Sequence, residues 1–474
     1  MFDLELSHTI LLIICLIIAC GFEFVNGFHD TANAVATVIY THSLKPWVAV
    51  IWSGFMNSLG VFFSALFGGM AVAMSIVNLL PVETLIDQNI AHSLSMLAAL
   101  LISAIIWNLL TWYFGIPCSS SHTLVGSILG VGIAYSFLSA SAEAAVNWGK
   151  AAEIGLSLLM SPLFGFSMTI FLMFLLRTLT KKKPYGSELF KEPKRNKPPR
   201  MWVRGILILT CTSVSFFHGQ NDGQKGVGLI MLILIGILPG FYALNNDYSL
   251  KNADKSIATI EKVIYSIDTI NLSFTDKNTL RKTRQIHASL ASTITNVPTV
   301  KALPREKRFE VRRDILLIEK NLNRLLNNPD IRISEKDRTS LESDIKEMRS
   351  ITDYSPVWVI VLISLSLGLG TMIGWKRIVK TIGEKIGKEH LTYAQGASAE
   401  FVAASTIGLS SAFGLPVSTT HVLSSGIAGS MVASKGVKNL QPTTVRNILV
   451  AWFLTLPIVM IMSGALFLIF RAIF

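Results

Sequence analysis

The sequence predicts an all-α polytopic membrane protein that carries a small helical polar insert, and three observations support this fold class. Of the 474 residues, 51% are hydrophobic and only 15% are charged. The mean hydropathy is +0.52, whereas a soluble domain has about 25% charged residues. Apolar runs suited to membrane helices recur along the chain, and one long polar stretch, 241–354, interrupts them.

The apolar runs account for most of the expected helices. A helix needs about 20 apolar residues to cross a bilayer, and the runs 94–110, 154–176 and 357–373 reach that length with their flanking residues. The first long segment, 7–40, is preceded by no Lys or Arg. This argues against a cleaved secretory signal, so we expect it to be a retained span.

Cysteine usage and net charge exclude two other classes of protein. The formal net charge is +12, but the basic residues gather in short loops, as in the cytoplasmic loops of membrane proteins, so nucleic acid is not an expected partner. The cysteines lie inside apolar runs without metal-ligand spacing, which predicts small buried residues rather than disulfides or a zinc site. They are Cys15, Cys20, Cys118 and Cys211.

Basic loops predict the orientation in the membrane. The loop 177–204 holds ten Lys and Arg against two Glu, and the loop 375–390 holds five Lys and Arg, so both are expected on the cytoplasmic side. The polar stretch has apolar residues at helical spacing and is predicted to form a small bundle on the opposite side. The predicted domains are a first membrane repeat (1–177), a basic cytoplasmic linker (178–204), a second membrane repeat in two parts (205–240 and 355–474) and the insert between them (241–354).

An internal duplication divides the membrane part into two halves. Residues 115–130 align without gaps on 414–429, with seven of sixteen positions identical. A second pair, 26–30 and 218–222, shares its Gly and its Asp. If the first pair forms the tips of two re-entrant helical hairpins, each half has an odd number of spans and the halves are inverted. Inverted repeats with broken helices are typical of secondary transporters, so we expect an inverted-repeat transporter.

Two acids lie at matching places within apolar stretches. An ionised carboxylate at membrane depth is costly unless it faces a cavity, a partner or an ion, so Asp30 and Asp222 predict a site for a coupling cation or proton. The alternative is that each caps a helix at the membrane edge. Neighbouring glycines allow the helices to break there. Asn33 and Asn221 are expected to contribute to this coupling site, and Asn26, His29 and Gln224 are expected to support it.

Two hydroxyl triplets follow Pro117 and Pro416 and precede apolar helices. Ser or Thr at such a place caps the helix, and the free N–H groups at a helix start suit a tetrahedral oxyanion such as phosphate. Ordinary caps without a ligand are the alternative. The predicted phosphate-binding residues are Ser119, Ser120, Ser121, Thr123, Ser418, Thr419 and Thr420.

Three further residues are candidates for the site. His122 and His421 follow the triplets and could donate to the anion or to a backbone carbonyl. Glu400 is an intramembrane acid whose aligned position in the first half is Leu101, and it is a candidate for handling substrate or proton. No spacing suggests a hydrolytic triad, so an enzyme is not expected.

Four motifs in this order resemble the inorganic phosphate transporter (Pit) family, and they look closest to its bacterial low-affinity permeases. The motifs are Gly27–Asn33, Pro117–His122, Gly219–Lys225 and Pro416–His421. The resemblance covers both membrane halves and not the insert. It implies a multi-pass protein of the bacterial inner membrane that binds phosphate between paired hairpin tips, while the paired acids coordinate the coupling cation.

Departures from the family pattern bear on the coupling ion. His29 replaces a common Asn, Lys225 replaces the Asn of sodium-coupled members, and Asn57 replaces the Glu of animal members. A fixed charge on Lys225 could stand in for a bound cation, so we expect coupling to H⁺ rather than Na⁺. Phosphate could also enter with Mg²⁺ or another divalent metal, and no organic cofactor is expected.

Several alternatives stay open. Sodium-coupled uptake of phosphate or of sulfate, an oxyanion of similar size, is one of them. A non-transporting receptor or scaffold, in which the insert acts, and an anion channel are two others. The expected partners are inorganic phosphate, the coupling cation and the lipid bilayer, and a homodimer is left open.

Overall fold

Helices joined by short connections make up the described part of the chain. The computed structural model describes residues 5–86, 89–138, 146–183, 186–193, 197–269, 272–328, 331 and 333–473. Some residues of the predicted linker (184–185, 194–196) and insert (270–271, 329–330, 332) therefore lie outside it. Two compact units are present, one from the chain up to Ile233 and again from Pro356, the other Leu234–Ser355.

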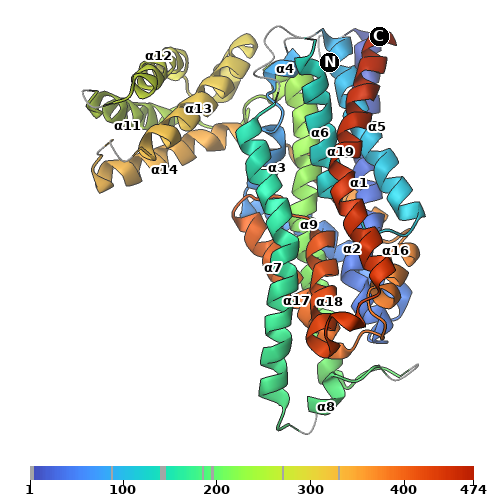
Figure 1. Cartoon of the computed structure of the whole chain (residues 1–474). Helices are drawn as coiled ribbons and strands as arrows, with labels where there is room; N and C mark the ends of the chain where they lie inside the picture. Colours follow the sequence, from blue (N-terminus) through green and yellow to red (C-terminus); the bar gives the residue numbers. More distant parts are fainter. Residues whose placement is uncertain are drawn as a thin grey trace. The chain divides into compact units, whose positions relative to one another are not determined.

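The first unit contains the long apolar helices (Figure 1). Six described helices, α1, α2, α5, α7, α9 and α19, are long and apolar enough to cross a membrane, which confirms a multi-pass protein. Up to the insert, the helices are α1 (Leu6–Tyr40), α2 (Pro46–Phe63), α3 (Ala71–Val77), α4 (Glu83–Ile86), α5 (Ile90–Tyr113), α6 (Ser120–Ser136), α7 (Trp148–Thr180), α8 (Gly186–Leu189) and α9 (Met201–Ile237). After it come α15 (Val357–Thr371), α16 (Lys376–Lys380), α17 (Tyr393–Ala412), α18 (Thr419–Lys435) and α19 (Pro442–Ile473).

Two helical hairpins, α5–α6 and α17–α18, carry the duplicated motif at their tips. The tips turn at Gly115 and Gly414, which have positive φ angles of 65° and 69° that glycine adopts without strain. Ser119 and Ser418 then cap α6 and α18, because their side chains accept the backbone N–H three residues on. The predicted caps are confirmed. In Figure 1, α6 extends toward the upper end of this unit and α18 toward the lower end.

Each half contributes a helix that packs against the hairpin of the other half. Helix α6 packs along α19, and α18 packs along α7. Gly130 of α6 lies so close to the backbone of Met460 that a Cβ would clash there, and Gly429 of α18 meets Phe166 of α7 in the same way. Gly130 and Gly429 are aligned in the duplication. The matched segments therefore make matched contacts, and the inversion of the halves stays a prediction.

The outer surface of this unit suits lipid. The most apolar windows of α7 and α19 are only 28% buried, although their mean hydropathies are 2.0 and 2.4. Large apolar side chains such as Leu159, Phe171, Phe453 and Ile461 are exposed on them. Exposed apolar surface of this extent is stable only against a bilayer or another apolar surface.

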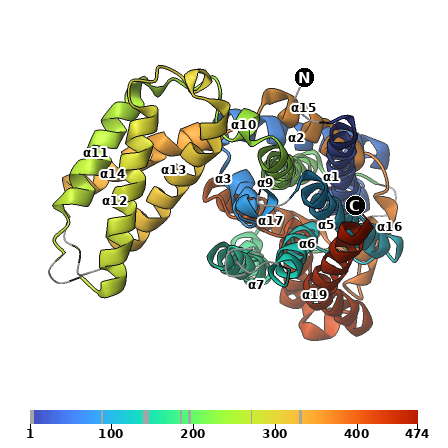
Figure 2. The same cartoon turned by 90° about the horizontal axis from the view of Figure 1, so that it is seen from above.

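The second unit is a bundle of four helices, seen side by side in Figure 2. Helix α12 packs on α13 and α11 packs on α14, with buried Ile260, Ile318 and Leu322 among the core side chains. Buried Arg308 donates to the backbone carbonyls of Gly240 and Leu303, which ties the connecting segments to α13. The bundle helices are α11 (Ala253–Ser266), α12 (Phe274–Ile294), α13 (Arg305–Leu326) and α14 (Glu335–Thr352), and the short α10 (Pro239–Tyr242) precedes them.

Candidate functional site

The two repeat-matched acids lie inside continuous helices. Asp30 is in α1 and Asp222 is in α9, and both helices run unbroken past these residues, so the breaks that the neighbouring glycines allow do not occur. The helices need not break, because the two acids reach their hydrogen-bond partners with their side chains while the backbone keeps its helical hydrogen bonds. Asp30 is 2% exposed and Asp222 is fully buried. Neither acid is a helix cap at the membrane edge.

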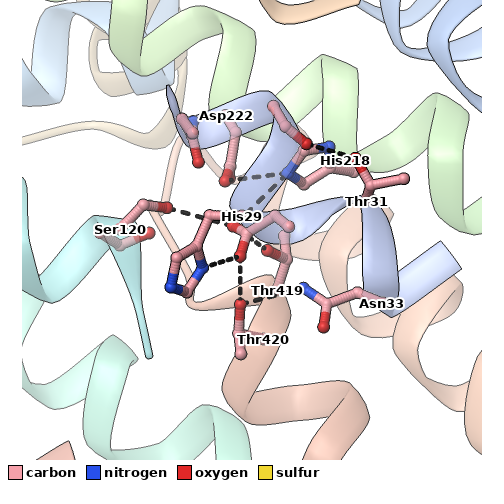
Figure 3. A network of polar contacts seen from close by, with 12 residues as sticks. His29, Thr31, Asn33, Ser120, His218, Asp222, Thr419 and Thr420 are labelled. Atoms are coloured by element: carbon pink, nitrogen blue, oxygen red, sulfur yellow. Dashed lines mark hydrogen bonds and ion pairs between the residues drawn. The ribbon is translucent and has the colours of Figure 1, made fainter. Parts of the chain in front are cut away.

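Hydroxyl groups from both hairpin tips converge on the carboxylate of Asp30. Ser120 of α6 donates to Oδ2 at 3.1 Å, and from α18 Thr419 donates to Oδ2 at 3.3 Å and Thr420 to Oδ1 at 2.5 Å. Figure 3 shows these three side chains directed toward one centre. Asn33, one turn along α1, donates to the Thr420 hydroxyl at 2.9 Å. The starts of α6 and α18 thus meet around one negative charge.

His218 of α9 lies between the two acids. Its Nε2 is 3.6 Å from Asp30 Oδ2 and 3.2 Å from Asp222 Oδ2. Asn57 of α2 fixes the ring, because its Nδ2 donates to Thr371 and its Oδ1 is therefore free to accept from His218 Nδ1 at 3.0 Å. Nε2 then faces both carboxylates, and a proton on it would be attracted by both (Figure 3).

Lys225 joins the second acid to both hairpin tips. Its Nζ donates to Asp222 Oδ1 at 2.6 Å, to Ser121 Oγ at 2.6 Å and to the Val417 carbonyl at 2.8 Å. These contacts use all the donors of an ammonium group. Ser121 in turn donates to the Val417 carbonyl at 2.8 Å. The buried charge of Lys225 is thereby paired and hydrogen-bonded, as a charge at this depth requires.

Two predicted site residues hold neighbouring backbone segments in place. Asn221 donates to the Leu415 carbonyl at 3.2 Å and accepts from the Val417 N–H at 3.3 Å, so it clamps the tip of the second hairpin. Gln224 accepts from the N–H groups of Val72 and Ala73 at the start of α3. Both side chains therefore contribute to the shape of the site.

Other predicted residues lie near the centre without reaching it. The Ser119 and Ser418 hydroxyls are used as caps, and the Thr123 hydroxyl donates to the backbone of its own helix. The His122 and His421 rings lie 4.6 Å apart, and His421 stacks on Trp452 at 3.9 Å.

His29 adds a contact of its own to the central acid. Its Nδ1 lies 3.3 Å from Asp30 Oδ1, and its Nε2 lies 3.3 Å from the Thr111 hydroxyl of α5. The residue that replaces a common Asn therefore supports the same carboxylate that the hairpin hydroxyls reach.

Two more buried acids belong to the same unit. Glu400 of α17 accepts from the Thr210 hydroxyl of α9 at 2.6 Å, and no described contact joins it to Asp30. Glu23 of α1 is fully buried and accepts from Asn26 Nδ2 at 3.2 Å. Sequence reasoning missed Glu23 and His218. Two signals in the sequence could have found them. Glu23 is an acid within an apolar run, and His218 is the first residue of the second paired motif.

The central triad could hold a cation. Asp30, His218 and Asp222 each offer one ligand atom, and these atoms lie within 4.8 Å of one another. Carboxylate and imidazole suit several divalent metals. Lys225 already occupies Asp222 Oδ1, so a cation would meet only Oδ2 of that acid.

Comparisons with known proteins agree over almost the whole chain. Residues 26–463 match the phosphate transporter family (PHO4). The chain is 40% identical to the low-affinity inorganic phosphate transporter PitA of Escherichia coli (strain K12), over 98% of this chain and 97% of that protein. It is 30% identical to the probable low-affinity inorganic phosphate transporter of Bacillus subtilis (strain 168), over 100% of both. A solved structure titled "The sodium-dependent phosphate transporter" has the same fold, with a TM-score of 0.55 and 21% identity over 98% of this chain and 100% of that one.

Proposed function

We propose that this chain, which belongs to the phosphate transporter family, takes up inorganic phosphate by symport with a cation, and that the cation is a proton. Because the chain belongs to a family of transporters, it is not an enzyme. The relatives are bacterial, and the six apolar helices make the chain a multi-pass protein of the inner membrane.

The convergence of hydroxyl groups on Asp30 carries the proposal. Ser120, Thr419 and Thr420 donate to one carboxylate at the starts of two helices. Helix starts attract anions through free N–H groups and the helix dipole. A carboxylate held in this way marks a place suited to an oxyanion, and phosphate would take over donors that Asp30 now uses.

This arrangement explains why a cation must accompany phosphate. Two unit negative charges about 4 Å apart repel by about 4 kcal/mol at an effective dielectric constant of about 20. An ionised Asp30 would therefore oppose phosphate binding. A proton on Asp30 removes that repulsion and turns the acid into a donor toward phosphate.

His218 and Lys225 support a proton over sodium. His218 lies within 3.6 Å of both acids, where it can exchange a proton with either. Lys225 neutralises Asp222 from a distance of 2.6 Å and so leaves less need for a bound metal cation. The amide oxygen of Asn57, which would suit sodium, instead accepts from His218 Nδ1 at 3.0 Å.

A second candidate is uptake of a neutral metal–phosphate complex. The Asp30–His218–Asp222 triad favours it, since its ligand atoms lie within 4.8 Å of one another. The charge of Lys225 beside Asp222 opposes a divalent ion. Uptake of labelled phosphate with and without Mg²⁺ at fixed pH distinguishes the two, because only a carried complex requires the metal.

The deciding experiment is accumulation of labelled phosphate in sodium-free proteoliposomes whose interior is made alkaline. We expect accumulation above equilibrium that stops when a protonophore is added. Strict dependence on added sodium without a response to pH would contradict proton coupling. If labelled phosphate only equilibrated across the membrane, the protein would be a channel. If no phosphate crossed, it would be a receptor. If sulfate inhibited phosphate uptake as strongly as unlabelled phosphate does, the substrate class would include sulfate.

A further inference from the structure

One face of α1 carries a line of buried polar side chains. Its members follow one another at intervals of three and four residues, which places them on one face of a helix. None is more than 2% exposed. The fifteen residues from the first to the last span about 21 Å along the axis. The polar face consists of Glu23, Asn26, Asp30, Asn33 and Thr37.

Much of this face lacks hydrogen-bond partners among the described residues. The unpaired buried atoms include Glu23 Oε1, Asn26 Oδ1 and Asn33 Oδ1. More than nine in ten buried polar groups in proteins are satisfied by protein or ordered water. Three unpaired atoms along one line therefore point to groups that exchange hydrogen bonds with water or protons during function.

A second carboxyl group stands at the far end of the face. Thr37 packs against Gly396 of α17, and Glu400 lies one turn later on that helix. Its Oε2 accepts from Thr210 of α9, and the Thr37 side chain of α1 acts on the same carboxyl group. Glu23 marks the other end, where its Oε1 abuts Gly226 of α9.

We infer that the polar face of α1 is the proton path of this transporter, with Glu23 and Glu400 as its terminal proton-binding groups on either side of Asp30. The inference rests on the proton coupling proposed above. A carboxylate at one end forms an O–H bond with a proton from water. Each later step breaks one such bond and forms the next through intervening water, so one proton leaves at the far end for each that enters.

Neighbouring helices supply the charges that each terminal acid faces. Asp222, Lys225 and His218 of α9 act on Glu23, as does Cys20 of its own helix. Of the three α9 residues, Asp222 is a negative group, Lys225 is a positive group and His218 can carry a proton. Glu400 faces Thr210 and Cys211 of α9 and Thr37 of α1.

The orientation of α1 assigns a side to each acid. Arg204, at the end of the basic linker, donates from Nε to the carbonyl of Ser43, just after α1 ends. If the linker is cytoplasmic, as its charge predicts, Glu400 is the inner terminal group and Glu23 is the outer one.

The test separates proton movement from phosphate binding. Glu23→Gln and Glu400→Gln keep the shape of the side chain and remove the titrating group. In proteoliposomes with equal phosphate and pH on both sides, exchange of labelled phosphate needs no net proton movement. We expect each variant to keep the exchange rate within about threefold of wild type. We expect accumulation driven by an alkaline interior to fall at least tenfold.

A matched variant and two other outcomes complete the test. Glu153→Gln, on the half-exposed side chain that pairs with Lys150 of α7, should leave both measurements unchanged. Retained accumulation in both test variants would overturn the proton path. Loss of exchange along with accumulation would also overturn it, since it would make the acids part of the phosphate site or the fold. Failure of the wild type to respond to pH would instead refute the proposed coupling.

Discussion

Asp30 is the residue on which both hairpins and His218 converge, so its charge should control transport. Replacing Asp30 with Asn keeps a side chain of the same size that can still bond to Thr420, but it removes the group that binds a proton or cation. We expect concentrative phosphate uptake by Asp30→Asn to fall to background while the protein still folds in the membrane. Asp222→Asn should do the same, since it leaves Lys225 without its carboxylate partner.

Labelled phosphate uptake, normalised to the protein in the membrane, measures this effect. Asp247→Asn is a suitable control, because the side chain of Asp247 is 82% exposed and pairs with exposed Lys301. Near-normal accumulation by both site variants would remove Asp30 and Asp222 from the coupling mechanism.

A substitution of Lys225 tests which ion is coupled to phosphate transport. Its ammonium group is 2.6 Å from Asp222 and acts as a tethered cation. Lys225→Asn removes this charge and restores the residue that sodium-coupled family members carry. We expect uptake either to be lost or to become dependent on sodium, measured over a series of sodium concentrations at fixed pH. Unchanged, sodium-independent uptake would show that Lys225 has no part in coupling.

The sequence predicted some of the site residues and missed others, and the difference has a physical reason. Asp30, Asp222 and Lys225 stand in duplicated motifs, and a charge within an apolar run is visible without any structure. The bridging place of His218 depends on the distance between α1 and α9, which no local pattern encodes. Glu23 has no acidic counterpart in the other half, because Ser215 occupies the matching place there.

At the scale of elements, neighbouring serines at the start of α6 have different tasks. The Ser120 hydroxyl donates to Asp30 at 3.1 Å, whereas Ser119 caps the helix. Ser120→Ala should raise the apparent KM for phosphate about ten- to hundredfold, the equivalent of a lost hydrogen bond to a charged partner of about 1.5–3 kcal/mol.

Ser119→Ala is the matched comparison. It should cost about 1 kcal/mol of stability, as the loss of an N-cap does, and leave KM within about threefold. Uptake kinetics and thermal unfolding in detergent measure both effects. A KM that rises only in Ser119→Ala would reverse the assignment.

Packing between α7 and α18 provides a prediction about stability. A Cβ on Gly165 would lie 2.5 Å from the Val422 carbonyl oxygen, whereas nothing lies within 4 Å of one on Gly155 of the same helix. Gly165→Ala should therefore lower the melting temperature in detergent. Gly155→Ala should raise the stability by up to about 1 kcal/mol, because alanine favours the helix. Equal effects of the two substitutions would show that the close approach of α7 and α18 is not rigid.

Element boundaries show what a sequence can and cannot predict. The caps at Ser119 and Ser418 followed from Pro, Ser and Thr chemistry that acts within a few residues. The helix breaks that glycines allow beside Asp30 and Asp222 do not occur, because a glycine permits a break without requiring one. Tertiary packing decided the outcome, since Gly27 and Gly219 serve instead for close approach to the backbones of Leu367 and Asn57.

The polar site and the polar insert belong to different compact units of the molecule. All of the predicted site residues belong to the first unit, whereas Leu234–Ser355 forms a unit with its own core. A receptor or scaffold would depend on the insert, and a transporter would depend on the first unit. Leu322→Asp distinguishes them, because Leu322 is fully buried in the bundle and an unpaired charge there should unfold it locally.

We expect Leu322→Asp to make the insert sensitive to a protease while phosphate uptake per inserted molecule keeps its KM within about twofold. Leu101→Asp, at an equally buried position of α5, should abolish uptake because the new charge lies in the unit that holds the site. Limited proteolysis reports the state of the insert, and labelled phosphate uptake reports the state of the site. Loss of uptake in Leu322→Asp at normal amounts of inserted protein would show that the insert takes part in transport.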